Sequence, residues 1–368
     1  MDRSESGPAL TRRQWLGFGA ALAAGFALPS AAETPPARAR LSLNENPYGP
    51  SPLALRAIRE ALADACRYPG DDVRALEEQI AACEGVAAGQ IIVGEILDQL
   101  GLHLALAGGP GGEFIYSEPG YTALVDAVAP GGGVAVGVPL DADLRNDLPA
   151  IAAHINANTR AIYLVNPHNP SGTVSDPAAF KRFLHEAAQR STVIVDEAYL
   201  EFEPDFGQQS AVELTRAGDN VIVFRTFAKL YGLAGLSIGY AVAPPAIAAE
   251  LKRKGLGEPH GLNRLAIAAA AASLRDARYV RETRARVIAE RERWHAFLDA
   301  RRLRRADSRG NFVFFETGHP HAQFAAALHA DGIEIARAFT PLDGWARISI
   351  GLPDENQRAR EAVARLLR

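Results

Sequence analysis

Short apolar runs alternate with amphipathic helical segments through the middle of the chain. Residues 113–116, 161–165, 193–195 and 221–224 are rich in β-branched and aromatic side chains, and each run ends at polar residues. Segments with helical spacing, such as 177–189, lie between these runs. Alternating strands and helices are typical of parallel sheets with crossover helices. The pattern therefore predicts an α/β fold with a mostly parallel sheet.

The pattern changes after residue 245. Long segments rich in Ala, Arg and Glu predict helices through about residue 300, followed by strands at 311–316 and 346–350 and a closing helix at 355–367. This order predicts a second, smaller α+β domain. The predicted organisation is an arm and first helix at 33–65, a large domain at 66–245 and a small domain at 246–368.

The first 32 residues have the composition of an export signal. An arginine pair, Arg12-Arg13, precedes an apolar run, and Ser30-Ala31-Ala32 offers a cleavage site before Glu33. The run is too short and too rich in Gly and Ala for a good membrane span, and it resembles a twin-arginine signal. A retained N-terminal helix is the alternative. We therefore expect the twin-arginine export machinery as a partner, a periplasmic protein and no stable membrane span.

Composition narrows the functional classes further. Apolar residues make up 48% and charged residues 22% of the chain, as in ordinary globular enzymes. The net charge of -4 provides no basic field, so nucleic acid is not an expected partner. The two cysteines, Cys66 and Cys83, provide neither a disulfide framework nor zinc-site spacing. We expect no metal, and we expect both thiols to be buried.

Polar residues follow several of the predicted strands, where parallel sheets bind their ligands. They are Tyr121 in SEPGY, Asn169 in NPHNPSG, Asp196 and Tyr199 in VIVDEAY, and Lys229 in RTFAK. A pyridoxal cofactor needs an amine for its aldehyde and a buried carboxylate for its ring nitrogen. It also needs hydrogen bonds for its hydroxyl and an aromatic neighbour for its ring. These five residues offer that set.

An ordered series of motifs makes a family resemblance plain. NENPYGPSP, RYPG, EPGY, NPHNPSG, VDEAY, RTFAK, GLAGL and RISIG occur in this order over about residues 41–352. In this series the chain resembles the class I/II aminotransferases that depend on pyridoxal 5'-phosphate, and most of all the histidinol-phosphate aminotransferases. The resemblance implies fold type I, with helices on both faces of the large sheet, pyridoxal 5'-phosphate as cofactor and a homodimer.

The resemblance also implies roles for single residues. Lys229 would hold the cofactor as a Schiff base and shuttle a proton, and Asp196 would pair with the ring nitrogen. The other cofactor contacts would come from Asn169 and Tyr199 at the ring hydroxyl, Tyr121 on the ring face, and Tyr68 at the phosphate across a dimer interface. The substrate contacts would come from Arg347 as a carboxylate-binding fork, from Tyr48 and Arg337 in the pocket wall, and from Asn311, which would position the pocket strand.

The segment VGEILDQL departs from the family's phosphate-binding turn, which is usually Gly-Ser-Gly or Gly-Ala-Asp. Glu95 stands in this turn, although Asp98 remains and is expected to help bind the cofactor. Ala228 replaces a usual serine, and Ser237 a usual arginine. Each lost charge-assisted hydrogen bond costs roughly 1.5–3 kcal/mol. Three explanations stay open: a substitute such as Arg225 or a rearranged loop, loose binding of the cofactor or a variant of it, or drifted chemistry.

Three functions are consistent with these residues. The predicted one is a transaminase (EC 2.6.1.-) that transfers an amino group between an amino acid, of histidinol-phosphate-like or aromatic type, and a 2-oxo acid. A lyase or decarboxylase on the same scaffold is the second. A non-catalytic binding protein of the cell envelope, suggested by the altered phosphate turn, is the third.

Overall fold

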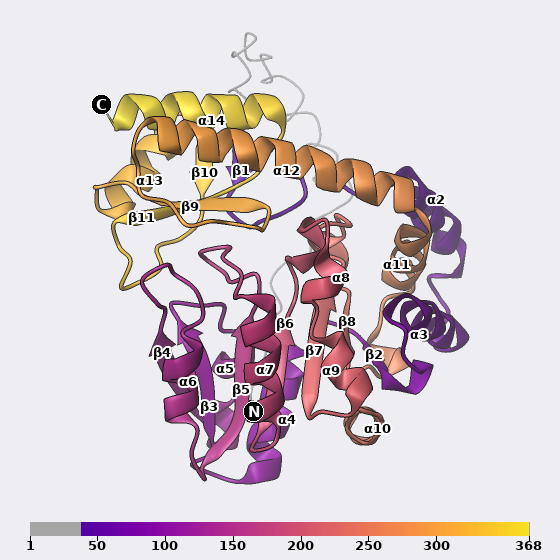
Figure 1. Cartoon of the computed structure of the whole chain (residues 1–368). Helices are drawn as coiled ribbons and strands as arrows, with labels where there is room; N and C mark the ends of the chain where they lie inside the picture. The colour runs from indigo at the N-terminus through magenta and orange to yellow at the C-terminus, as the bar shows by residue number, and fades with distance from the viewer. Residues whose placement is uncertain (1–37, 368) are drawn as a thin grey trace, which may run out of the picture. The chain divides into compact units, whose positions relative to one another are not determined.

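A seven-stranded sheet in the order β2-β8-β7-β6-β5-β3-β4 lies at the centre of the computed structural model, which describes residues 38–367 (Figure 1). The predicted signal at 1–32 lies outside the described residues. Neighbouring strands run parallel, except that β8 is antiparallel to both β7 and β2. The strands are β2 (Ile91–Val93), β3 (Glu113–Glu118), β4 (Val134–Pro139), β5 (Thr159–Val165), β6 (Thr192–Asp196), β7 (Val221–Thr226) and β8 (Gly239–Val242).

Alternate residues of the central strands are buried on opposite faces of this sheet. In β5, Ala161, Tyr163 and Val165 belong to one apolar cluster, and Ile162 and Leu164 belong to another. Burial on both faces explains why these strands are near-continuous apolar runs in the sequence. The helices on the Tyr163 face are α4 (Leu97–Gly108), α5 (Ala123–Asp126) and α10 (Pro245–Arg253). Those of the other cluster are α2 (Pro52–Ala61), α3 (Gly70–Glu84), α6 (Leu148–His154), α7 (Pro177–Ala188), α9 (Val212–Ala217) and α11 (Arg264–Arg275).

A second apolar core surrounds an antiparallel pair, β9 (Phe312–Glu316) and β11 (Trp345–Ser349). It is covered by α12 (Ala277–Ala300), α13 (His321–Ala330) and α14 (Pro353–Leu366). The first described strand, β1 (Ala39–Leu41), pairs in parallel with β10 (Ile333–Ile335) in this core. Both ends of the described chain therefore contribute to one small core. Helices α10 and α11 pack against the large sheet. The helical part of the small core therefore begins with α12.

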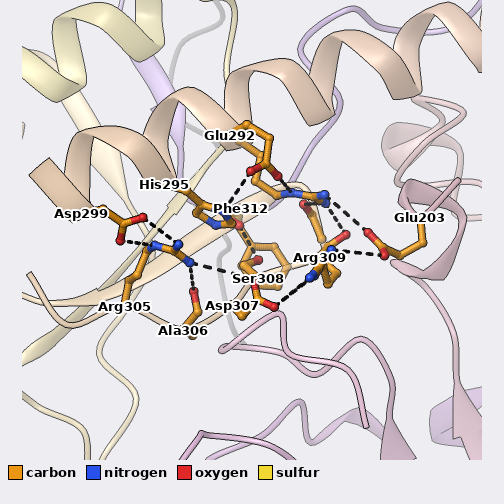
Figure 2. A network of polar contacts seen from close by, with 12 residues as sticks. Glu203, Glu292, His295, Asp299, Arg305, Ala306, Asp307, Ser308, Arg309 and Phe312 are labelled. Carbon is orange, nitrogen blue, oxygen red and sulfur yellow. Dashed lines mark hydrogen bonds and ion pairs between the residues drawn. The ribbon is translucent and has the colours of Figure 1, made fainter. Parts of the chain in front are cut away.

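Ion pairs connect α12 to the loop before β9 and to the large sheet (Figure 2). Arg305 binds Asp299 at the end of α12 at 2.8 Å. Arg291, buried on the same helix, donates to the carbonyl of Arg309 at 2.6 Å and lies 3.4 Å from Glu203. Because Glu203 follows a short turn after β6, this network links the two cores.

The fold class read from the sequence is confirmed, and each predicted central strand is present with slightly wider bounds. Strands β2, β4 and β8 are not among the predicted ones. The expectation that Cys66 and Cys83 are buried is wrong, because both thiols are exposed. Within residues 38–367, no helix combines the length and apolar character that a membrane span needs. In the same range, no cluster of His, Cys, Asp and Glu is arranged to hold a metal ion.

Candidate active site

Two cavities meet at the carboxyl ends of β6 and β7. One has a volume of about 500 Å³ and contains Asp196, Thr226 and Glu95 in its wall. The other has about 550 Å³ and includes Asn169 and Arg347. Tyr121, Ala123, Tyr199 and Lys229 line both. The two cavities therefore form one site. The shared residues lie in its middle, Glu95 lies at one end and Arg347 at the other.

Asp196 is a buried carboxylate at the last position of β6. Its Oδ1 accepts a hydrogen bond from the amide of Ala198 at 2.9 Å, and its Oδ2 accepts one from the hydroxyl of Tyr163 at 3.0 Å. Burial disfavours the charged form and raises the pKa of Asp196 to about 6 despite these two donors. A cationic ligand group beside Asp196 would favour its ionised form.

The amine of Lys229 lies in the shared middle of the site, in the loop after β7. Its Nζ donates to the carbonyl of Leu43 at 3.3 Å and lies 5.7 Å from the centre of the Tyr199 ring. The Tyr199 hydroxyl accepts hydrogen bonds from the side-chain amides of Asn44 at 3.2 Å and Asn169 at 3.3 Å. The proton of that hydroxyl is therefore free for a ligand oxygen.

Tyr121 forms a wall of both cavities. Its side chain is 45% exposed, so one part of the ring faces the open site. Partial burial raises the pKa of Tyr121 to about 12, and the nearby Asp196 adds to this effect. The phenol therefore stays protonated, and its ring is available for stacking.

Arg347 is a buried cation with no acidic partner in the part of the chain that the structure describes. It lies on β11, donates to the carbonyl of Ser42 at 2.8 Å and to the side-chain oxygen of Asn169, and packs between Phe312 and Phe339. No carboxylate within residues 38–367 forms an ion pair with it, and its Nε is buried without a hydrogen-bond partner. Burial lowers the pKa of Arg347 to about 10, so it is still charged at neutral pH. Such a group can bind an anion.

The opposite end of the site is acidic. The hydroxyl of Thr226 donates to the carboxyl of Glu95, whose pKa is raised by burial. Asp98, Ala228 and Ser237 also line this end. The nearby cation Arg225 cannot substitute for the missing arginine, because its guanidinium binds Glu84 at 2.8 Å and Glu197 at 2.9 Å in a separate buried network.

The remaining predicted residues lie further from this centre. Arg337 is exposed at the rim of the Arg347 cavity, with its guanidinium 4.7 Å from the ring centre of Phe339. Asn311 supports the arm by donating to the carbonyl of Asn44 at 2.9 Å. Tyr48 lines neither cavity, and the guanidinium of Arg286 lies over its ring at 5.3 Å.

Tyr68 is separated from the site within this chain. Its side chain is 74% exposed, packs edge-on against His260 at 4.7 Å and lines a different cavity of about 560 Å³. Asp98 does reach the site, but its carboxylate accepts a hydrogen bond from the amide of Gln99 in the first turn of α4.

Three residues that contact the site residues were not predicted from the sequence. Asn44 in the NENPYG motif adopts a left-handed conformation, with φ of 55°, and holds Tyr199. Its position in a motif rich in turn residues was an available signal. Tyr163 lies inside an apolar strand, and Thr226 ends one, so neither stood out by pattern.

Comparisons with known proteins agree with this geometry. The model of the family "Aminotransferase class I and II" matches residues 39–366. A histidinol-phosphate aminotransferase of Limosilactobacillus fermentum is 34% identical over 329 residues, which cover 88% of this chain and 90% of that protein. An aromatic amino acid aminotransferase of Cutibacterium acnes is 35% identical over 333 residues, covering 89% of this chain and 92% of that protein.

A solved structure shows the same fold. The histidinol-phosphate aminotransferase of Sinorhizobium meliloti, in complex with pyridoxal-5'-phosphate, superposes with a TM-score of 0.82 at 31% identity, covering 90% of this chain and 91% of that one. The family match over residues 39–366 includes both cores and the strand ends that carry Asp196 and Lys229. The chain belongs to the class I and II aminotransferases.

Proposed function

We propose that this transaminase acts in the periplasm, as a homodimer, on an amino acid of histidinol-phosphate-like or aromatic type and a 2-oxo acid. The observation that supports transamination of an anionic amino donor is the arrangement of Lys229 between Asp196 and Arg347. It combines a lysine amine, a buried carboxylate and a buried cation that has no acidic partner within residues 38–367 around one pair of cavities. The histidinol-phosphate-like or aromatic type is proposed from the two relatives named above.

Pyridoxal 5'-phosphate is the cofactor, and when bound it supplies an aldehyde for amine exchange and a ring that withdraws electrons. The residues at the ring end fit this group. Asp196 offers a carboxylate for a protonated ring nitrogen, and the Tyr199 hydroxyl is free to donate. The phosphate end fits less well, because Glu95 and Asp98 line it and no arginine among residues 38–367 does.

Three side chains of this protein have separate roles in the proposed reaction. Arg347 binds the anionic group of the substrate, a carboxylate or a phosphate, with the Asn169 side chain holding the guanidinium in place. The amine of Lys229 is the one lysine amine lining the described site, so it takes and returns the proton at the reacting carbon. The ring of Tyr121 covers the site from the side open to solvent.

The homodimer is proposed from the family resemblance together with the position of Tyr68. This tyrosine is highly exposed and separate from the Lys229 site of its own chain. A second copy that received Tyr68 at its phosphate end would bury an aromatic ring and give its hydroxyl a partner. The periplasmic location is proposed from the arginine pair and apolar run at 1–32.

A donor–acceptor screen on the mature protein tests the proposed reaction. With cofactor added, amino donors should bleach the visible absorbance of the protein-bound cofactor, and 2-oxo acids should restore it. Lys229→Ala should abolish both changes. Release of carbon dioxide without consumption of the oxo acid would instead indicate a decarboxylase. Full biological activity of the Lys229→Ala variant would contradict an enzymatic role.

A further inference from the structure

The end of the cavity that carries Glu95 is where the phosphate-bearing arm of the cofactor must lie. In the pyridoxal ring, the aldehyde carbon stands between the carbon with the ring hydroxyl and the carbon with the arm. Asn169 and Tyr199 flank the hydroxyl side, and Lys229 marks the aldehyde. The arm therefore leaves the ring on the side away from Asn169, toward Glu95 and Thr226.

The charges at this end are opposite to those that a phosphate needs. The charged side chains of residues 38–367 that line this cavity are Glu95, Asp98, Asp196 and Lys229. Lys229 is committed to the aldehyde and Asp196 to the ring nitrogen, so the two carboxyl groups of Glu95 and Asp98 remain at this end. A phosphate with nearly two negative charges is bound elsewhere by cations and amides. Here it would meet like charges in a partly buried site.

Two of the hydrogen-bond donors at this end are already engaged. The Thr226 hydroxyl donates to Glu95, and the amide of Gln99 in the first turn of α4 donates to Asp98. Ser237 keeps a free hydroxyl at the cavity wall. The Asp98 carboxylate already accepts from an amide in the first turn of α4, where an anion could bind, and Glu95 stands two residues before this helix.

Glu95 is held firmly in this place. A β-carbon on Gly239 would lie 3.1 Å from Glu95 Oε1, so the glycine permits the close approach of the carboxyl group to β8. Thr226 fixes the same oxygen from β7, which leaves Oε2 as an acceptor. A carboxyl group with a free oxygen is a good partner for an alcohol, which donates a hydrogen bond and has no charge.

We propose that Glu95 makes this site discriminate against the phosphate dianion. The chain then binds pyridoxal 5'-phosphate in a readily dissociable way, and it binds the dephosphorylated form, pyridoxal, at least as tightly. The inference rests on the cofactor chemistry of the proposed function. It identifies Glu95 as the residue that sets which form of the cofactor is retained.

Equilibrium titration of cofactor-free mature protein, followed by absorbance, tests this proposal. Wild-type protein should bind pyridoxal with an affinity equal to or higher than that for pyridoxal phosphate. Glu95→Gln and Glu95→Ser should each raise the phosphate ester's affinity by about tenfold to a hundredfold, the usual range for removing one like charge from a partly buried site. Glu186→Gln, which removes an exposed carboxylate from α7, should change neither affinity.

The outcomes separate this inference from the proposed function. If neither compound binds, or if the imine absorbance persists in Lys229→Ala, the proposed function fails. If both bind through Lys229 but the phosphate ester binds a hundredfold more tightly, the inference about Glu95 is overturned. A cation supplied by a second copy of the chain would produce this tighter binding of the phosphate ester. Unchanged affinities in both Glu95 variants would also overturn it.

Discussion

The hydroxyl of Tyr163 donates a 3.0 Å hydrogen bond to Oδ2 of Asp196 from the neighbouring strand of the sheet. Both residues are buried, and the parallel pairing of β5 with β6 fixes their separation. In the absence of a ligand cation, this hydroxyl, the amide of Ala198 and the charge of Lys229 are the groups that stabilise the Asp196 carboxylate.

The cofactor-free protein should become more stable when Asp196 is replaced by Asn. The pKa of Asp196 is about 6 in the folded protein and 3.8 ordinarily, so ionisation opposes folding. The loss of folding free energy caused by this ionisation is absent below pH of about 4 and grows up to pH of about 6. Above that pH it stays constant, with an upper limit of about 3 kcal/mol.

Chemical unfolding at pH 4 and pH 7.5 measures this effect. Asp196→Asn should exceed the wild type in free energy of unfolding at pH 7.5 and differ little from it at pH 4. The asparagine side chain of this variant can still accept from Ala198, so the comparison isolates the charge. A variant less stable than the wild type at pH 7.5 would contradict the interpretation of Asp196 as a buried charge awaiting a cation.

Tyr163→Phe should weaken the site without disturbing the fold. Loss of the hydroxyl removes a hydrogen bond worth roughly 1–1.5 kcal/mol and raises the pKa of Asp196 further. Cofactor affinity should fall about tenfold, and the acidic limb of the pH–rate profile should move to higher pH. Tyr116→Phe is the matched control, because its hydroxyl donates to Glu118 instead. Equal profiles for the two variants would refute this role of Tyr163.

Arg347→Lys should act mainly on substrate binding. A lysine cannot reproduce the planar fork, and the remaining buried contacts to Ser42 and Asn169 would lose their partner. Losses of 2–5 kcal/mol are common for such sites, so kcat/KM should fall from roughly 30-fold to several thousandfold, mostly through KM. Arg304→Lys, an exposed arginine beside Trp345, should leave KM within about twofold, as expected for a surface charge. A fall in kcat alone would point to another role for Arg347.

Gly172→Ala should destabilise the protein by about 2–5 kcal/mol. Its φ of +76° disfavours any side chain, and a β-carbon there would lie 1.9 Å from the Ser308 hydroxyl oxygen. Gly111→Ala is the control, since its φ is +82° but no atom lies within 4 Å of the added carbon. Thermal unfolding should show a clearly larger loss for Gly172→Ala. Equal losses would mean that Ser308 moves aside without cost.

The sequence predicted the interior of the large sheet well, because β5, β6 and β7 are buried on both faces and appear as apolar runs. It did not reveal β2 or β8, whose three and four residues are too short to show a period. The group of Asn169, Asp196, Tyr199 and Lys229 could be predicted because each follows a strand that ends at the same edge of the sheet.

The directions of single side chains could not be predicted. Arg225 could face either the cofactor or the buried network. Its direction depends on the side of β7 that it occupies and on its partner Glu84, which lies 141 residues earlier in the chain. The separation of Tyr68 from its own chain's site likewise depends on packing against His260. Such long-range contacts leave no periodic signal in a single sequence.

The arm that closes the site over Lys229 has a consequence for biosynthesis. The backbone amide of Asn44 donates to the Ser349 hydroxyl at 2.8 Å, across 305 residues, and β1 pairs with β10. Chains grow from the N-terminus, so the arm leaves the ribosome long before its partners exist. A nascent chain must hold this segment unpaired until Ser349, 305 residues later, has been synthesised. The reactive amine gains its complete surroundings only after that residue has been added.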